Sequence, residues 1–133
     1  MTHSLDTNVC VRYLNGRAIS VRDKLAAMSQ SAVIVCAIVK AELYAGAMKS
    51  INPVQTRTEQ QAFLDQFISL PFDDAAASVY ASIRVHLEYA GTPIGPYDLQ
   101  IAAIALANNL ILVTHNTREF SRVPGLVLED WEV

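Results

Sequence analysis

The chain has 133 residues, of which 52% are apolar and 17% are charged, against about 25% charged in an ordinary soluble domain. Acids outnumber bases by 13 to 10, so the formal net charge is −3. This composition excludes intrinsic disorder, and the length predicts a single domain over residues 1–133. At face value the acidic balance also argues against a nucleic-acid partner, which usually requires a basic surface.

Membrane insertion and secretion are not expected. The longest apolar stretch, around residues 99–113, is interrupted by polar residues such as Gln100, and it falls short of the roughly 18 apolar residues of a membrane helix. The N-terminus has no basic segment followed by an apolar one. Cys10 and Cys36 lie in apolar segments without a CxxC spacing, so we expect buried thiols in a cytoplasmic protein.

Short apolar segments alternate with longer helical ones along the chain. The expected strands are residues 2–5, 32–36, 70–72, 110–114 and 126–129. The expected helices are residues 9–14, 20–29 and 37–49, one that begins near Pro53, one that Asp73 or Asp74 caps and that ends near Tyr89, and 96–109, followed by a short turn at 117–120.

Polar residues set the first helix ends. Thr7 or Asn8 is placed to cap the first helix, and Gly16 is placed to close it. Ser20, with Asp23 three residues later, is typical of a capping box at the start of the second helix.

Strands of about five residues that alternate with helices of ten or more are typical of a parallel sheet covered on both faces. We therefore predict an α/β fold with three layers, α/β/α, around a central, mainly parallel sheet. Ligands of such folds bind outside the carboxyl ends of the strands. The residues that follow Leu5, Cys36 and Val113 are the places to search for a site.

Three acids occupy unusual positions in this pattern. Asp6 stands between an apolar strand and an apolar helix, and Glu42 lies on a helix between the small residues Ala41 and Ala45. Asp98 lies in the first turn of a helix that is apolar nearly all round. The alternatives are a helix cap for Asp6, a solvent-exposed acid for Glu42 and a helix-start acid favoured by the dipole for Asp98. Taken together, the three would repel one another at one sheet edge unless cations relieve the repulsion.

The candidate ligands are all oxygen atoms, so Mg²⁺ or Mn²⁺ is the expected cofactor, and the three histidines are not expected to be ligands. Thr114, Asn116 and Glu119 follow a buried strand and should reach the same edge. Asn116 could supply a carbonyl oxygen, and Glu119 could bind a second ion directly or through water. The alternative for this segment is a capped turn with Glu119 in solvent.

Four motifs, in order and at suitable intervals, resemble the PIN-domain ribonucleases. They are LDTN (5–8), AEL (41–43), PYDLQIA (96–102) and LVTHNTREF (112–120). The resemblance is closest to VapC, the toxin of bacterial type II toxin–antitoxin pairs, and it extends over the whole chain. Residues 94–120 are most similar to the VapC subgroup that cleaves initiator tRNA.

The resemblance assigns roles to residues of this chain. Asp6, Glu42 and Asp98 match the acidic metal ligands of the family. Asn116 stands where the family often has a fourth acid, and Glu119 is placed to take over that charge. The polar positions that brace the acids are matched by Thr7, Asn8 and Thr114.

The resemblance also implies an activity and partners. It implies a metal-dependent endoribonuclease that hydrolyses RNA phosphodiester bonds, in the anticodon loop of tRNA(fMet). It further implies a homodimer, and a hetero-oligomer with a VapB-type antitoxin that occludes the site. Arg118 is expected to contact substrate phosphate, and its alternative is a plain surface charge.

Two other functions stay open at this point. One is an inactive PIN module that binds RNA or a partner without cutting. The other is a phosphatase that forms an aspartyl-phosphate on Asp6, but that chemistry needs an acid at position 8, where this chain has Asn8. The net charge no longer opposes an RNA partner, because removing four pocket acids from 13 leaves 9 against 10 bases, a balance of +1.

Overall fold

The computed structural model describes residues 1–132. Its sheet has the strand order β2-β1-β3-β4, and all neighbouring strands are parallel. The strands are β1 (His3–Leu5), β2 (Val33–Ile34), β3 (Ile111–Val113) and β4 (Leu128–Glu129). In the register of the central pair, His3 lies opposite Ile111 and Leu5 opposite Val113.

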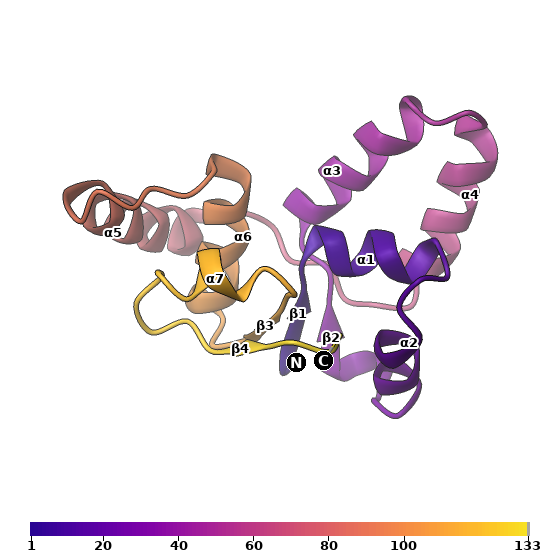
Figure 1. Ribbon diagram of the computed structural model, residues 1–133, viewed down its shortest axis with the longest axis horizontal. Coiled ribbons are helices and arrows are strands. Elements are labelled where there is room, and N and C mark those ends of the chain that lie inside the picture. Colours follow the sequence, from indigo (N-terminus) through magenta and orange to yellow (C-terminus); the bar gives the residue numbers. More distant parts are fainter. Residues whose placement is uncertain (133) are drawn as a thin grey trace.

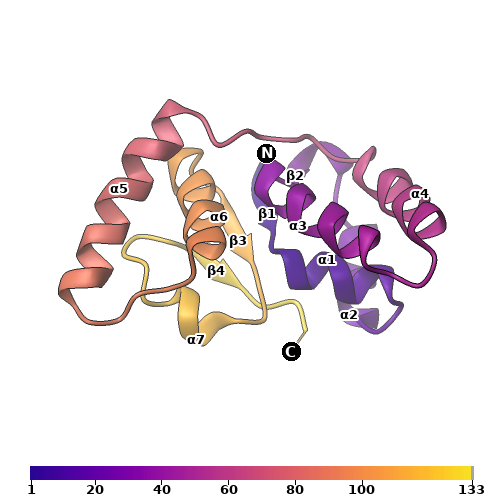
Figure 2. The same ribbon diagram turned by 90° about the horizontal axis from the view of Figure 1, so that it is seen from above.

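Helices cover both faces of this sheet. They are α1 (Thr7–Leu14), α2 (Ile19–Ala26), α3 (Ala37–Met48), α4 (Pro53–Leu64), α5 (Asp74–Tyr89), α6 (Pro96–Ala107) and α7 (Thr117–Phe120), with a short 3₁₀ turn, η1 (Gln30–Ala32). Figures 1 and 2 show α1 to α4 on one side of the strands and α5 and α6 on the other. The predicted α/β architecture with three layers is confirmed.

Helix α6 is the most deeply buried helix of the fold. It packs against α5 and β3, and its side chains from Ile101 to Ala105 are fully buried. A helix with apolar residues on all sides needs such two-sided cover, so the sequence prediction for this segment is confirmed. The predicted burial of Cys10 and Cys36 as free thiols is also confirmed.

The strand expected at residues 70–72 does not form. The chain instead makes an isolated bridge between Ile68 and Ile34, and the carbonyl of Leu70 accepts a hydrogen bond from the Ala37 amide at 2.9 Å. Pro71 has no amide hydrogen to donate to a neighbouring strand, which prevents a regular ladder here.

Two expected helix caps are wrong. Asp6, rather than Thr7 or Asn8, is the N-cap residue of α1, because the helix begins directly after β1. The capping role that was the alternative for Asp6 is therefore confirmed. Helix α2 begins at Ile19, so Ser20 lies inside it, and its cap residue makes no side-chain hydrogen bond. The cap expected at the long helix α5 is confirmed as Asp73, whose carboxylate accepts from the Ala76 amide at 3.0 Å.

The end of α1 follows the prediction. Gly16 has φ of +69°, a left-handed conformation that glycine adopts without strain, and it lies directly after the cap residue Asn15. Within residues 1–132, no helix combines the length and the apolar character needed to cross a membrane.

The burial of α6 makes a prediction about stability. Ile104 is fully buried, so Ile104→Ala should lower the free energy of unfolding by about 2–5 kcal/mol through lost contacts and a cavity. Val85 on α5 is 46% exposed, and Val85→Ala should change it by no more than about 0.5 kcal/mol. Urea unfolding of both variants measures the difference, and equal losses would contradict the buried position of Ile104.

Candidate active site

Asp6 is the most buried acid at the carboxyl edge of the sheet, with 3% of its surface exposed. Its amide donates to the carbonyl of Val113 at 3.0 Å, which ties the end of β1 to the end of β3. Carboxylate atom Oδ1 accepts from the Thr7 amide at 2.7 Å, and Oδ2 accepts from the Thr114 hydroxyl at 2.9 Å. The side chain is therefore held at both oxygens, and each oxygen still has a lone pair for another partner.

Glu42 reaches the same edge from α3. Its Oε1 accepts from the Thr7 hydroxyl at 2.7 Å, so Thr7 contacts Asp6 through its amide and Glu42 through its side chain. The small residues Ala41 and Ala45 line a cavity of about 190 Å³ together with Glu42 and Tyr97. The small side chains of the two alanines therefore leave open space next to the Glu42 carboxylate.

Asp98 lies in the first turn of α6, which packs against α3, the helix that carries Glu42. Asp98 is half-buried, and burial is the main cause that raises its pKa to about 6. The negative charges of Asp6, Glu119 and Glu42 raise this pKa further. The four acids therefore share one electrostatic environment.

The segment after β3 joins the same network. The Thr114 hydroxyl donates to Asp6 and accepts from the Asn116 amide at 3.0 Å. The side-chain amide nitrogen of Asn116 donates to Oε2 of Glu119 at 2.9 Å. Glu119 is thus hydrogen-bonded within the site rather than free in solvent, and the side-chain oxygen of Asn116 stays available as an acceptor.

Burial also raises the pKa of Asp6. The hydrogen bonds from Thr114 and Thr7 oppose this increase, whereas the charges of Glu42 and Glu119 add to it. A divalent cation would remove the repulsion between these groups, and a set of carboxylate oxygens fits a hard cation such as Mg²⁺ or Mn²⁺. The donor chemistry of the site therefore fits the expected cofactor.

Two residues that were predicted to belong to the site, Asn8 and Arg118, lie outside the hydrogen-bond network of the acids. Asn8 is exposed on α1 and lines a cavity with Asn116, so it lies beside the network without bracing a carboxylate by a hydrogen bond among the described residues. Arg118 is exposed on α7, next to Glu119 in sequence. Its position is compatible with a phosphate contact and with a plain surface charge.

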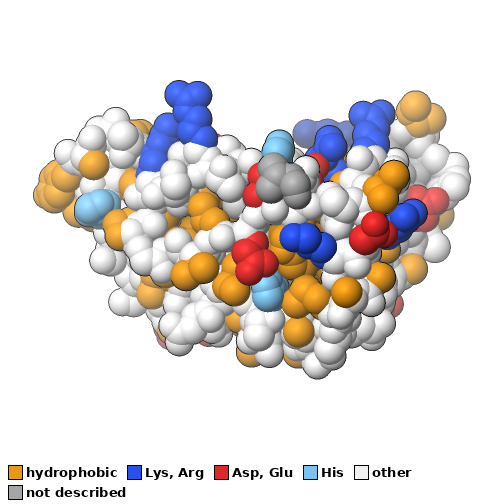
Figure 3. All heavy atoms as spheres, turned by 60° about the horizontal axis from the view of Figure 1, so that its bottom comes forward, with side chains coloured by type: hydrophobic (Ala, Val, Ile, Leu, Met, Phe, Trp, Pro, Cys, Tyr) orange, Lys and Arg blue, Asp and Glu red, His pale blue; other side chains and the backbone are white. Residues whose placement is uncertain are grey.

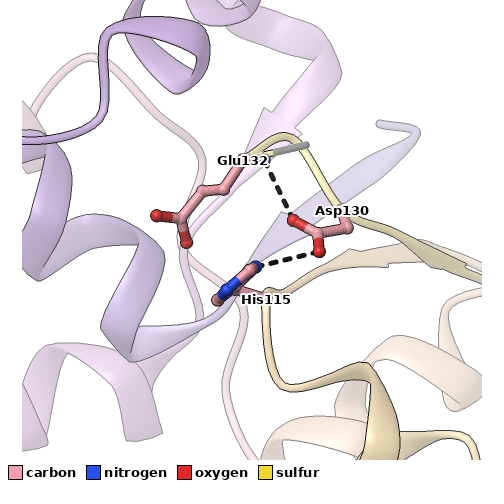
Figure 4. A group of neighbouring side chains, drawn as sticks. All are labelled: His115, Asp130 and Glu132. Atoms are coloured by element: carbon pink, nitrogen blue, oxygen red, sulfur yellow. Dashed lines mark hydrogen bonds and ion pairs between the residues drawn. The ribbon is translucent and has the colours of Figure 1, made fainter.

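One group near the site was not predicted from the sequence. His115, Asp130 and Glu132 each place a possible ligand atom within 4.8 Å of the other two (Figure 4). His115 follows β3, and the two acids follow β4, the neighbouring strand. The sequence feature that could have indicated this group is the end of β4, because the carboxyl end of this strand lies at the same edge of the sheet as the ends of the other strands.

The chain matches known proteins over nearly its whole length. The PIN domain matches residues 4–126. The tRNA(fMet)-specific endonuclease VapC of Shigella flexneri is 39% identical over 127 residues, which cover 96% of each chain. A crystal structure of DNA-bound VapBC from Salmonella typhimurium superposes with a TM-score of 0.94 at 35% identity, covering 98% of each chain.

A further structure gives the same result. VapBC2 from Rickettsia felis, bound to a DNA fragment from its promoter, has a TM-score of 0.92 at 34% identity and covers 98% of this chain and 99% of its own. The chain therefore belongs to the PIN domain family, and within it to the VapC proteins. The resemblance drawn from the four motifs is confirmed.

The raised pKa of Asp98 predicts that the folded state becomes less stable as the pH rises. In the folded state the pKa of the Asp98 carboxyl is about 6, so this group is largely protonated near pH 4. As the pH rises through this range, the unfolded chain releases its proton first, so the folded state loses stability. In metal-free protein at pH 7.5, Asp98→Asn should therefore raise Tm, and the gain should shrink toward pH 4.

Calorimetry at both pH values measures this difference. Asp23→Asn, at an exposed surface acid, is the matched control and should give no such gain. A lower Tm for Asp98→Asn at pH 7.5 would show that ionised Asp98 does not destabilise the fold.

Proposed function

We propose that residues 1–133 form one PIN domain that acts as a metal-dependent endoribonuclease toxin, restrained by a VapB-type antitoxin. The observation that carries this proposal is the hydrogen-bond network that joins Asp6, Glu42 and Glu119 at one sheet edge. Asp98 lies near enough that the charges of these three acids raise its pKa. The names of the relatives supply the reaction, since they describe endonucleases and ribonucleases.

In this proposal Asp6 and Asp98 are the principal ligands of a first Mg²⁺ or Mn²⁺ ion. Glu42 helps to bind that ion or to orient a water molecule, and Glu119 with Asn116 completes a weaker second site. A divalent ion held by these residues would supply Lewis-acid chemistry: it would polarise the phosphoryl oxygens, lower the pKa of a bound water and stabilise the leaving alkoxide.

The chain's own residues supply the orientation. Thr7 and Thr114 hold both oxygens of Asp6, and Thr7 also holds Glu42. Asn116 holds Glu119 through its amide nitrogen. Because Asp6, Glu42 and Glu119 are held by these hydrogen bonds, three of the four acids need little reorganisation when a cation binds.

Exposed basic side chains are the candidates for contacts with an RNA strand. Figure 3 shows a dip in the outline of the molecule, with Lys and Arg side chains on both raised flanks. The flanks belong to the two helical layers on either side of the sheet. Arg118 on α7 is exposed and is our candidate for a direct phosphate contact.

The substrate and partners are proposed from the relatives. The match to a tRNA(fMet)-specific endonuclease supports initiator tRNA as the substrate. The anticodon loop is the proposed place of cleavage because the family resemblance implies it. The solved VapBC complexes support an assembly with a VapB-type antitoxin. A homodimer of this chain within that assembly is proposed from the family resemblance. The two other functions are less well supported, because the acids are retained as one group and Asn8 is not an acid.

The proposed metal ligands predict how RNA cleavage responds to substitutions and to removal of the metal. Asp98→Asn and Asp6→Asn should each reduce cleavage of total tRNA by at least about 100-fold, because each removes a carboxylate ligand of the cation that would stabilise the negative charge of the transition state. Asp23→Asn should cleave at the parent rate. The parent should need Mg²⁺ or Mn²⁺ and stop in EDTA, and sequencing of RNA 5′ ends after a pulse of expression should place the cut in the tRNA(fMet) anticodon loop.

Each failure has a distinct meaning. Full activity in a folded Asp98→Asn protein would overturn the site assignment. Cleavage that persists in EDTA would overturn the metal dependence, and RNA binding without cleavage would favour the inactive module. Hydrolysis of a phosphomonoester would favour the phosphatase.

A further inference from the structure

A second group of side chains lies beside the acidic site and takes no part in the proposed reaction. Among residues 1–132, His115, Asp130 and Glu132 form the single group of three or more His, Cys, Asp or Glu residues whose ligand atoms lie within 4.8 Å of one another. Figure 4 shows the two carboxylates on either side of the His115 ring. The donor set is one imidazole and two carboxylates.

Glu132 carries an unsatisfied buried atom. Its side chain is 7% exposed, and its Oε1 pairs with the guanidinium of Arg12. The other oxygen, Oε2, is buried and has no hydrogen-bond partner among the described residues. A buried carboxylate oxygen without a partner is costly, and this one points to a missing ligand.

The other two side chains are held in position. The Glu132 amide donates to Oδ1 of Asp130 at 2.9 Å, and Oδ2 of Asp130 lies 2.9 Å from Nδ1 of His115. Trp131, between the two acids, is 2% exposed, and its indole nitrogen donates to Glu129 at 2.9 Å. The buried tryptophan therefore anchors the segment that carries both carboxylates.

The group has room for an ion and its water ligands. His115 is 59% exposed, whereas Asp130 is 15% exposed. Beside them lies a cavity of about 360 Å³, lined by Asn8, Val11, Arg12, His115, Asn116 and Glu132. Arg12 offsets one of the two carboxylate charges, which leaves the neutral-histidine form of the group net negative.

We propose that His115, Asp130 and Glu132 bind one divalent transition-metal ion, with Zn²⁺ as the best match. Zinc accepts imidazole and carboxylate ligands at about 2.0–2.2 Å, and three protein ligands plus water is a common set. The imidazole distinguishes this site from the all-oxygen site at Asp6 and Asp98, which suits Mg²⁺ or Mn²⁺. The ion ties the segment after β4 to the turn after β3, which carries Asn116.

The test measures Zn²⁺ binding instead of activity. The chain is stripped with a chelator, exchanged into buffer at pH 7.5 and titrated with Zn²⁺ in a calorimeter. The background is the double variant Asp6→Asn/Asp98→Asn, which removes the principal ligands proposed for the other site. We expect one equivalent of Zn²⁺ in this background and a higher Tm when Zn²⁺ is present.

His115→Ala in that background should weaken Zn²⁺ binding by at least about tenfold. Loss of a residue that only hydrogen-bonds to a metal ligand already lowers metal affinity by about this factor, and His115 is proposed as a direct ligand. His86→Ala, at an exposed histidine on α5, is the matched control and should bind as the background does. Asp130→Asn keeps the shape of the side chain and should also weaken binding, so it replaces His115→Ala if that variant is unfolded by circular dichroism.

Absence of Zn²⁺ binding in the Asp6→Asn/Asp98→Asn background would overturn the proposal. Unchanged binding in folded His115→Ala or Asp130→Asn would also overturn it. Neither result bears on RNA cleavage, so the proposed ribonuclease function is tested separately.

Discussion

Repulsion between carboxylates that the fold crowds together is the interaction on which the site depends. Asp6 is almost fully buried, and burial together with the charges of its neighbours raises the pKa of Asp98 to about 6. Groups in this situation either take up protons or bind a cation. The proposed metal site is an example of cation binding. Because a divalent ion relieves the repulsion between the carboxylates, that repulsion increases the affinity of the site for the ion.

The parallel sheet produces this crowding. Strands β1 and β3 run in the same direction and end together, so Asp6 and Thr114 meet although they are 108 positions apart in the sequence. Helix α3 follows β2 and brings Glu42 to the same edge, and the start of α6 adds Asp98. The deeply buried α6 gives Asp98 a rigid base, because its packing against α5 and β3 leaves little freedom to move.

Patterns along the chain were sufficient to predict the acids at strand and helix ends and the order of the elements, except for the strand expected at residues 70–72. They were insufficient where the outcome depends on distant contacts. The bond from Thr7 to Glu42 joins residues 35 apart, and no local pattern contains it. The capping signal at Ser20 failed because α2 starts one residue earlier, at Ile19. The group around His115 was missed because it depends on β4, a strand of only two residues. The pairing of β4 with β3 is not revealed by the sequence alone.

The central claim is that the carboxylates at this edge hold a divalent cation. The most direct measurement is anomalous X-ray diffraction from crystals of the chain soaked in Mn²⁺. We expect an anomalous peak within bonding distance of the Asp6 and Asp98 carboxylates, at about 2.0–2.6 Å, with Glu42 beside it. Manganese that binds elsewhere on the molecule and leaves these two carboxylates without a peak, at a concentration that supports RNA cleavage, would contradict the claim.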